Sequence, residues 1–269
     1  MKSLKHKYHI IGEGWDEIEE IRNVPKKIKI LKFVVEQGIV SVDDVKRKFD
    51  IPDKSDVARK TMSELKISHV KYGSIKNGVW YVDRQELLNR LQSYYMKMPD
   101  FQPRKIRLHE VPHALQMNHI RLMLEKSKEA NVVAWQSEAY IRALPPYQRN
   151  GFGVKKMPDA IFFRGSNDGG AAKKYFLEYE RTLKNKERYT DIWGHYMKRI
   201  DVTRKSVLYI CENALCKARL LQMMQSIQER EEKKGGEFRS EIFRFETIDE
   251  FNQAFQKKGR EVSYADDAL

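Results

Sequence analysis

Apolar residues between positions 25 and 83 recur first at the spacing of helices and then at that of strands. The segment PKKIKILKFVVEQGIV carries apolar residues three and four positions apart, which predicts a helix that ends near Gly38. Ser41 and Ser55 are suitable N-terminal caps for two further helices. The β-rich run HVKYGSIKNGVWYVD follows, with Asn77 and Gly78 as its turn. The pattern therefore predicts three helices and then a β-hairpin.

Residues 112 to 256 alternate between helical and strand patterns. A helix begins at Pro112, and a strand or strand-turn follows it at 131–142. The remaining segments are predicted as strands at 159–164, 174–181, 206–211 and 241–246, and as helices at 185–200, 214–234 and 248–258. A helix, three strands, a helix and a strand are expected to build a mixed sheet between helices.

A connector separates these two regions. A helical pattern in ELLNRLQSYYMKM is followed by PDFQPRKIRLHEVP, which contains three prolines. Domain boundaries fall in such segments, where few contacts cross. We expect a boundary near residue 105, which divides the chain into domains 1–104 and 105–269.

Composition restricts the class of protein. The chain has 269 residues, of which 41% are hydrophobic and 33% charged, as in a globular protein with a substantial core. No apolar run approaches the roughly 20 residues that span a bilayer, and the N-terminal residues lack the apolar region of a secretory signal. Cys211 and Cys216 have no nearby metal-binding partners and are expected to be packing residues. We expect a cytoplasmic protein without a membrane partner.

The positive charge indicates a polyanionic partner. The net charge is +13, and residues 142–205 alone hold fifteen lysines and arginines against seven acids. Nucleic acid is the usual partner of such a protein. A solvated basic surface is the alternative interpretation.

Two predicted strands inside this basic region carry carboxylates. Asp159 opens one strand, and Glu178 and Glu180 lie two residues apart on the next. Side chains at i and i+2 of a strand point to the same face, so the two glutamates are expected to be neighbours. Like charges at that distance repel unless a cation lies between them. Alternatively, the glutamates face solvent on an edge strand and pair with nearby cations: Lys173, Lys174 or Arg181.

The first unit has the element order of a winged helix-turn-helix. The third helix of such a module reads DNA, and here Val57, Met62 and Leu65 are expected to face inward. The polar side chains then expected to contact DNA are Arg59, Lys60, Ser63 and Lys66, with Lys76 on the wing. The same topology also serves as a protein-interaction module.

Across residues 112–232 the sequence resembles the replication-relaxation family of plasmids and mobile elements. It also resembles the MobC-type mobilisation relaxases, which share a restriction-endonuclease-like PD-(D/E)xK core. The residues that carry the resemblance are His113-Ala114-Leu115, Trp135 with Glu138, Pro158-Asp159, FLEYERT at 176–182 and Tyr196. The order of a winged helix followed by this core is also typical of the family.

The resemblance implies a divalent metal site. Asp159, Glu178 and Glu180 would bind Mg²⁺ or Mn²⁺, with Glu138 completing the shell of ligands. Glu180 occupies the place where most nucleases of this fold carry lysine. A lysine could reach the site from the following helix, and the two candidates for this catalytic role are Lys184 and Lys186.

The resemblance also implies the function. We expect a relaxase-type endonuclease that binds a double-stranded plasmid origin and nicks one strand, with other mobilisation or replication proteins as partners. A non-catalytic replication or transcription regulator with a degenerate nuclease core is the main alternative. A restriction-type nuclease that cuts both strands is the third.

Overall fold

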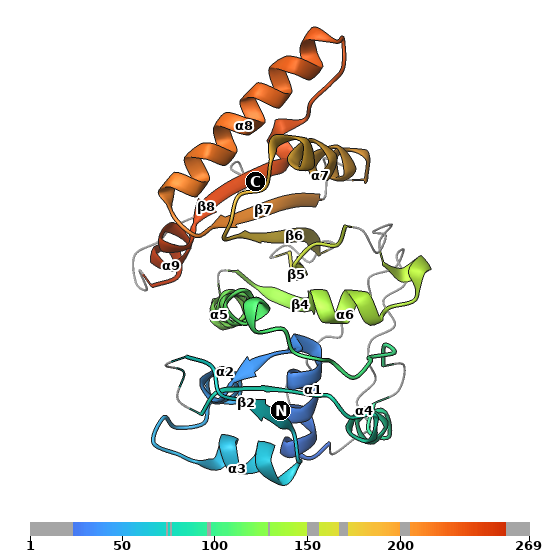
Figure 1. Ribbon diagram of the computed structural model, residues 1–269, viewed down its shortest axis with the longest axis vertical. Coiled ribbons are helices and arrows are strands. Elements are labelled where there is room, and N and C mark those ends of the chain that lie inside the picture. The colour runs from blue at the N-terminus through green and yellow to red at the C-terminus, as the bar shows by residue number, and fades with distance from the viewer. Residues whose placement is uncertain are drawn as a thin grey trace.

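The computed structural model shows a mixed α/β protein (Figure 1). It describes residues 24–73, 75, 77–95, 98–128, 130–149, 156–166, 172–199 and 205–256. These residues form nine α-helices, a three-stranded sheet and a five-stranded sheet. Among the described helices, none has the length and apolar character needed to cross a membrane.

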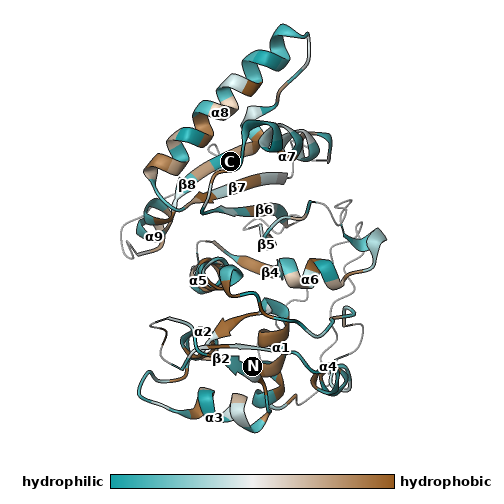
Figure 2. Ribbon diagram, in the orientation of Figure 1, coloured by the Kyte–Doolittle hydropathy of each residue, from teal (hydrophilic) through white to brown (hydrophobic). Residues whose placement is uncertain are grey.

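The N-terminal unit contains three helices around a small antiparallel sheet. Its elements are α1 (Lys26–Gln37), β1 (Val40–Ser41), α2 (Val42–Lys48), α3 (Val57–Glu64), β2 (Ser68–Val70) and β3 (Val79–Tyr81). The strand order is β1-β3-β2. Figure 2 shows that α1 is mostly hydrophobic, and its apolar side chains lie at the centre of this unit. The three helices and the hairpin occur in the predicted order, but the short strand β1 between α1 and α2 was not predicted.

Local residues explain where these elements begin and end. Gly38 adopts a φ of 76° and ends α1. The hydroxyl of Ser41 accepts from the backbone N–H of Asp44, and the Asp44 carboxylate accepts from the N–H of Ser41, which forms a capping box. Gly78 has a φ of 61°, and a Cβ there would overlap the carbonyl oxygen of Val70. The predicted Ser41 cap is therefore confirmed. Asn77 and Gly78 lie between β2 and β3 with positive φ angles, but Val70 pairs with Val79, so the connection is longer than the predicted two-residue turn.

The orientation predicted for Val57 is wrong. Met62 and Leu65 are buried as expected, but Val57 is 51% exposed. The helix α3 begins at Val57, and its N-cap is Asp56 rather than the predicted Ser55, whose hydroxyl accepts from the backbone N–H of Val57. The side chain of this first helical residue therefore lies at the edge of the unit.

The second unit is a five-stranded sheet with helices on both faces (Figure 1). Its main elements are α5 (Val111–Lys126), β4 (Val132–Ser137), α6 (Glu138–Ala143), β5 (Ala160–Arg164), β6 (Lys173–Glu180), α7 (Lys186–Arg199), β7 (Lys205–Cys211), α8 (Ala214–Lys233), β8 (Phe243–Thr247) and α9 (Ile248–Gln256). The strand order is β4-β5-β6-β7-β8, with antiparallel pairing up to β6 and parallel pairing beyond it.

The central strand β6 is covered on both faces. Phe176 belongs to the apolar cluster on the side of α7 and α8, whereas Leu177 and Tyr179 belong to the cluster on the side of α5 and α9. Glu178 and Glu180 share the face of Phe176, because side chains alternate along a strand. Both glutamates are therefore in a covered part of the sheet.

The core of the N-terminal unit continues across residue 105. Leu122 of α5 and Tyr140 and Leu144 at α6 belong to the same apolar cluster as the buried side chains of α1. Val111 similarly packs with Ile39 and Val79. The expectation of few contacts across the connector is wrong, because α5 and α6 of the second unit also pack apolar side chains against the N-terminal unit. The connector itself contains α4 (Gln85–Gln92) and the short helix η1 (Leu108–Glu110).

Candidate functional site: a cleft lined by paired carboxylates

A cleft of about 1210 Å³ lies between the two units. The connector, α5 and α6 form one side of it, and the ends of β5 and β6 with the start of α7 form the other. All the acidic residues predicted for the metal site line this cleft: Glu138, Asp159, Glu178 and Glu180.

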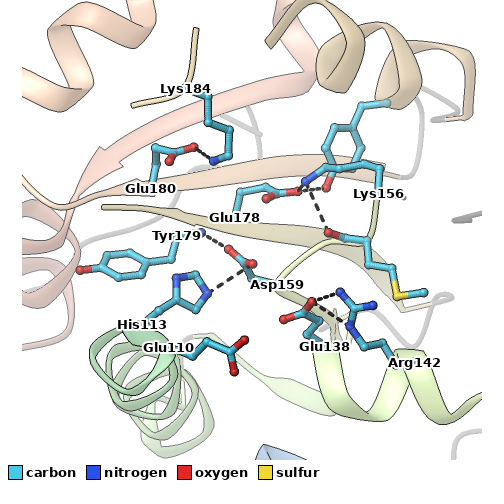
Figure 3. Close-up of polar contacts among 12 residues, drawn as sticks. Glu110, His113, Glu138, Arg142, Lys156, Asp159, Glu178, Tyr179, Glu180 and Lys184 are labelled. Carbon is cyan, nitrogen blue, oxygen red and sulfur yellow. Dashed lines mark hydrogen bonds and ion pairs between the residues drawn. The ribbon is translucent and has the colours of Figure 1, made fainter. Parts of the chain in front are cut away.

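Strand pairing brings Asp159 beside Glu178. Ala160 of β5 pairs with Leu177 of β6 in an antiparallel register, so Asp159 lies opposite Glu178. The Oδ2 atom of Asp159 accepts from the backbone N–H of Tyr179 at 2.7 Å, which fixes the carboxylate at the end of the strand pair (Figure 3). The sequence expectation that these two elements are neighbours is confirmed.

Glu178 is a buried carboxylate with two side-chain donors. The ammonium group of Lys156 donates to its Oε1 atom at 2.5 Å (Figure 3), and the hydroxyl of Tyr196 donates to the same oxygen. Burial raises the pKa of Glu178; Lys156 opposes this shift, and the negative charge of Asp159 adds to it. The carboxyl therefore has a raised pKa beside a second acid.

Glu180 is also buried, with its own cation. Lys184 lies in the turn before α7, and its ammonium group is 2.5 Å from the Glu180 carboxylate. Lys186 lies at the start of α7 and donates instead to the hydroxyl of Ser226 on α8. Of the two candidate lysines, the structure therefore brings Lys184 to the carboxylates and directs Lys186 away. The solvent-facing alternative is wrong for Glu178 and Glu180, since they are only 7% and 4% exposed.

Glu138 is the first residue of α6 rather than part of a strand. The hydroxyl of Ser137 accepts from the N–H of Tyr140 and caps this helix. The backbone N–H of Glu138 donates to the carbonyl of Asp159 at 2.9 Å, so the two main chains are in contact. The side chain of Glu138, however, pairs with Arg142 one helical turn later.

His113 supplies a positive partner for Asp159. Its Nε2 atom is 3.3 Å from Oδ1 of Asp159 (Figure 3), and its ring lies against that of Tyr179. Burial alone would lower the pKa of His113, but the carboxylates of Asp159, Glu138 and Glu178 together outweigh burial and raise it above its usual value. The pair therefore favours the charged imidazolium.

Three arginines line the cleft without a recorded side-chain partner among the described residues. They are Arg107 in the connector, Arg181 after β6 and Arg188 on α7, and all three are exposed. Guanidinium groups match phosphate oxygens in geometry as well as in charge. The cleft thus places free cations near the buried carboxylates.

Asp159 and Glu178 are suitable ligands for Mg²⁺ or Mn²⁺. These are hard cations, and Mg²⁺ in particular is usually held by one or two carboxylates and several waters. The negative charge of Asp159 raises the pKa of Glu178, and a divalent cation between them would relieve this repulsion. Within the described ranges, no three histidines, cysteines or acids form a group that could hold a metal. Of the four predicted ligands, Asp159 and Glu178 are the two that strand pairing places opposite each other.

The predicted DNA-contacting residues lie on and after α3. Lys60, Ser63 and Lys66 are exposed, and Lys66 adopts a φ of 58° just beyond the helix. Arg59 is partly exposed and pairs with Asp56 at 3.2 Å. Lys76 lies outside the described residues.

Sequence reasoning missed the cationic partners of the acids. Lys156 precedes the Pro-Asp pair by two residues, yet it contacts a carboxylate 22 positions away. His113 entered only as part of a motif, and its partner is 46 positions away in the chain. No short-range pattern links such residues, because the sheet pairing brings them together.

Comparisons with protein-family models, with curated proteins and with solved structures found no match for this chain.

Proposed function

We propose that this protein binds double-stranded DNA and nicks one strand in a reaction that depends on Mg²⁺ or Mn²⁺. One observation carries the proposal: a single cleft contains the buried Glu178, the partly buried Asp159 beside it, and three arginines available for phosphates. Phosphodiester cleavage requires both features, because the backbone must be held while negative charge develops on it. The net charge of +13 and the resemblance to plasmid replication-relaxation proteins support DNA as the substrate.

The proposal includes a finer description of the fold. The N-terminal unit would be a winged helix, with α3 as the reader and the β2–β3 hairpin as the wing. The second unit would be a restriction-endonuclease-like domain with β5 and β6 as its acidic strands. The element order and the strand pairing support this assignment. The protein would then be a relaxase-type endonuclease that acts at an origin in the cytoplasm, alongside other mobilisation or replication proteins.

Each residue in the cleft has a separate role in this proposal. A metal ion between Asp159 and Glu178 would polarise the scissile phosphate and lower the pKa of a bound water. Arg107, Arg181 and Arg188 would bind the flanking phosphates. Glu180 would accept the proton of the attacking water, and its ion pair with Lys184 would orient the carboxylate.

Two further residues would hold the acids in place. His113 fixes Asp159 through their contact, and Tyr196 fixes Glu178 by its hydrogen bond. Lys156 supplies positive charge beside Glu178 and can turn toward a phosphate oxygen, because its side chain is at the cleft wall.

A second candidate function is DNA binding without cleavage, as in a replication or transcription regulator. The observation that favours it is that each acid already has a cation from the chain. Glu178 is paired with Lys156, Glu180 with Lys184, Glu138 with Arg142, and Asp159 with His113. A site neutralised in this way can be stable without a metal.

Incubation with supercoiled plasmid would distinguish these functions. Plasmids with and without a candidate origin are treated with the protein in Mg²⁺, Mn²⁺ or EDTA, and Asp159→Asn serves as the control. Nicked circles that require metal and Asp159 support the proposal. DNA binding without nicking supports the regulator, and linear product supports a restriction-type nuclease that cuts both strands.

A further inference from the structure

Tyr147 is an exposed aromatic side chain in the segment that follows α6. It is 82% exposed, more than any other large hydrophobic side chain in the described part of the chain. It lies in the short helix η2 (Pro146–Gln148), which follows α6 after a few residues. Glu138, Arg142 and Ala143 of α6 line the cleft. Tyr147 is therefore connected to a cleft wall by a short segment.

This segment is held in one conformation. Pro145 and Pro146 fix two successive φ angles, and the N–H of Gln148 donates to the carbonyl of Pro145 at 2.9 Å. The guanidinium group of Arg149 donates to the carbonyls of Leu144 and Arg142, at 2.8 and 3.0 Å. These bonds attach the turn to the end of α6, so the ring of Tyr147 projects from a rigid support.

An exposed ring on a fixed turn, a few residues from a helix that lines a cationic cleft, is suited to a particular partner. Exposed aromatic rings contribute little to folding, but they bind the flat faces of unpaired nucleobases by stacking. Such stacking needs no hydrogen-bond pattern, and a ring on a fixed turn requires little ordering of the backbone on binding. The free arginines of the cleft would hold the backbone from which such a base extends.

We infer that Tyr147 stacks against an unpaired base of DNA whose backbone occupies the cleft. The inference rests on the proposed function for the presence of DNA, and adds that the protein prefers DNA with locally opened base pairs. Paired bases in a duplex are already stacked on both faces, so they offer no surface to the ring. Tyr147 would therefore contribute to the binding of opened DNA and not of intact duplex.

The test compares two DNA molecules of the same sequence, one fully paired and one with a short internal bubble containing 2-aminopurine. Affinity is measured by fluorescence anisotropy at fixed salt, and stacking by quenching of the 2-aminopurine. The wild type is compared with Tyr147→Phe, which keeps the aromatic ring, and with Tyr147→Leu and Tyr147→Ala, which remove it. Leu221→Ala removes an exposed apolar side chain from α8, away from the cleft, and is the control.

The expected result is tighter binding of the bubble by the wild type, and a loss of about tenfold for Tyr147→Ala and Tyr147→Leu. Tyr147→Phe should retain both the affinity and the quenching, and duplex affinity should be the same in all variants. If the wild type binds duplex but Tyr147→Ala binds the bubble as tightly as the wild type does, this inference is overturned and the proposed function is not. Failure to bind either DNA overturns it together with the proposed function. A change in sedimentation between wild type and Tyr147→Ala would assign the ring to a protein contact instead.

Discussion

Lys48 and Glu125 are 77 residues apart in the chain, yet the ammonium group of Lys48 donates to the Glu125 carboxylate at 2.5 Å. The other oxygen of Glu125 accepts from Nε of Arg121 at 2.7 Å. Lys48 ends α2 in the N-terminal unit, whereas Glu125 and Arg121 lie on α5. One carboxylate therefore links the two units.

Glu125→Gln should destabilise the whole protein. The substitution removes one charge-assisted hydrogen bond, worth about 1.5–3 kcal/mol, while the amide oxygen of glutamine can still accept the other, so we expect the free energy of unfolding to fall by roughly 1.5–3 kcal/mol at pH 7. Urea unfolding followed by circular dichroism measures this change. Glu229→Gln, at an exposed position of α8, is the matched control and should have little effect.

The effect of Glu125→Gln should depend on pH. Burial alone would raise the pKa of Glu125, but Arg121 and Lys48 outweigh burial and hold it below its usual value of 4.5. A carboxyl of this kind stabilises the fold above its unfolded pKa and loses that contribution as the pH falls through its folded pKa. The difference between wild type and variant should therefore disappear in acid. A difference that is constant from pH 7 to pH 3 would contradict the role of the charge.

The DNA-reading role of α3 can be tested by replacing Arg59 and Lys60 with alanine. Loss of two phosphate contacts should weaken binding to all DNA sequences, and should reduce the slope of log affinity against log salt by about 2. Lys233→Ala with Lys234→Ala, at the far end of α8, removes the same charge and should leave the slope unchanged. Equal slopes for the two double variants, in titrations over a range of salt, would exclude contact by this helix.

Glu178→Gln should abolish nicking and Mn²⁺ binding without destabilising the fold. The pKa of Glu178 is raised, chiefly by burial, so its contribution to stability is greatest in acid and is lost as the pH rises through that pKa. Glutamine carries no charge, so the melting temperature in EDTA should be unchanged or higher than that of the wild type. The gain should be larger at pH 8 than at pH 4. Calorimetric titration of Mn²⁺ and melting curves at both pH values provide the measurements, and tight Mn²⁺ binding by the variant would place the metal elsewhere.

Comparing substitutions of Lys184 and Lys186 tests whether a lysine that contacts the carboxylates contributes to catalysis. Lys184 contacts Glu180 and lines the cleft, whereas Lys186 is directed to Ser226 on α8. We expect Lys184→Ala to lower the rate of nicking by roughly 10²-fold or more, the size expected for a group that orients a catalytic acid or base. Lys186→Ala should leave the rate nearly unchanged. Similar rates for both variants would remove Lys184 from the mechanism.

Features that depend on neighbours in the chain were predictable from the sequence. The end of α1 follows from Gly38 and the start of α2 from Ser41, and Asn77-Gly78 marks the segment between β2 and β3, although not the length of that connection. The nearness of Asp159 to Glu178 was also predictable, because a short connection between two strands favours an antiparallel pair. Glu138 was misplaced although Ser137, a good helix cap, directly precedes it.

Features that depend on distant segments were not predictable in the same way. Leu122 and Tyr140 are apolar residues on helices, and nothing in their spacing indicates that they pack with α1. The ion pairs of Glu178 with Lys156 and of Asp159 with His113 likewise require the assembled sheet. Burial of Glu178 and Glu180 follows from coverage by α7 and α8, which a strand pattern with one apolar face does not reveal.

The apolar core shared by α1, α5 and α6 fixes the distance between the N-terminal unit and the cleft. The helix α3 and the cleft cannot move apart without exposing side chains such as Leu122 and Tyr140 to water, at about 25 cal/mol for each Å² uncovered. A duplex that contacts both α3 and the cleft would therefore be held at two points a fixed number of base pairs apart. The phosphate chosen for attack would then be set by counting from the bound sequence, and the bases around that phosphate would need no recognition of their own.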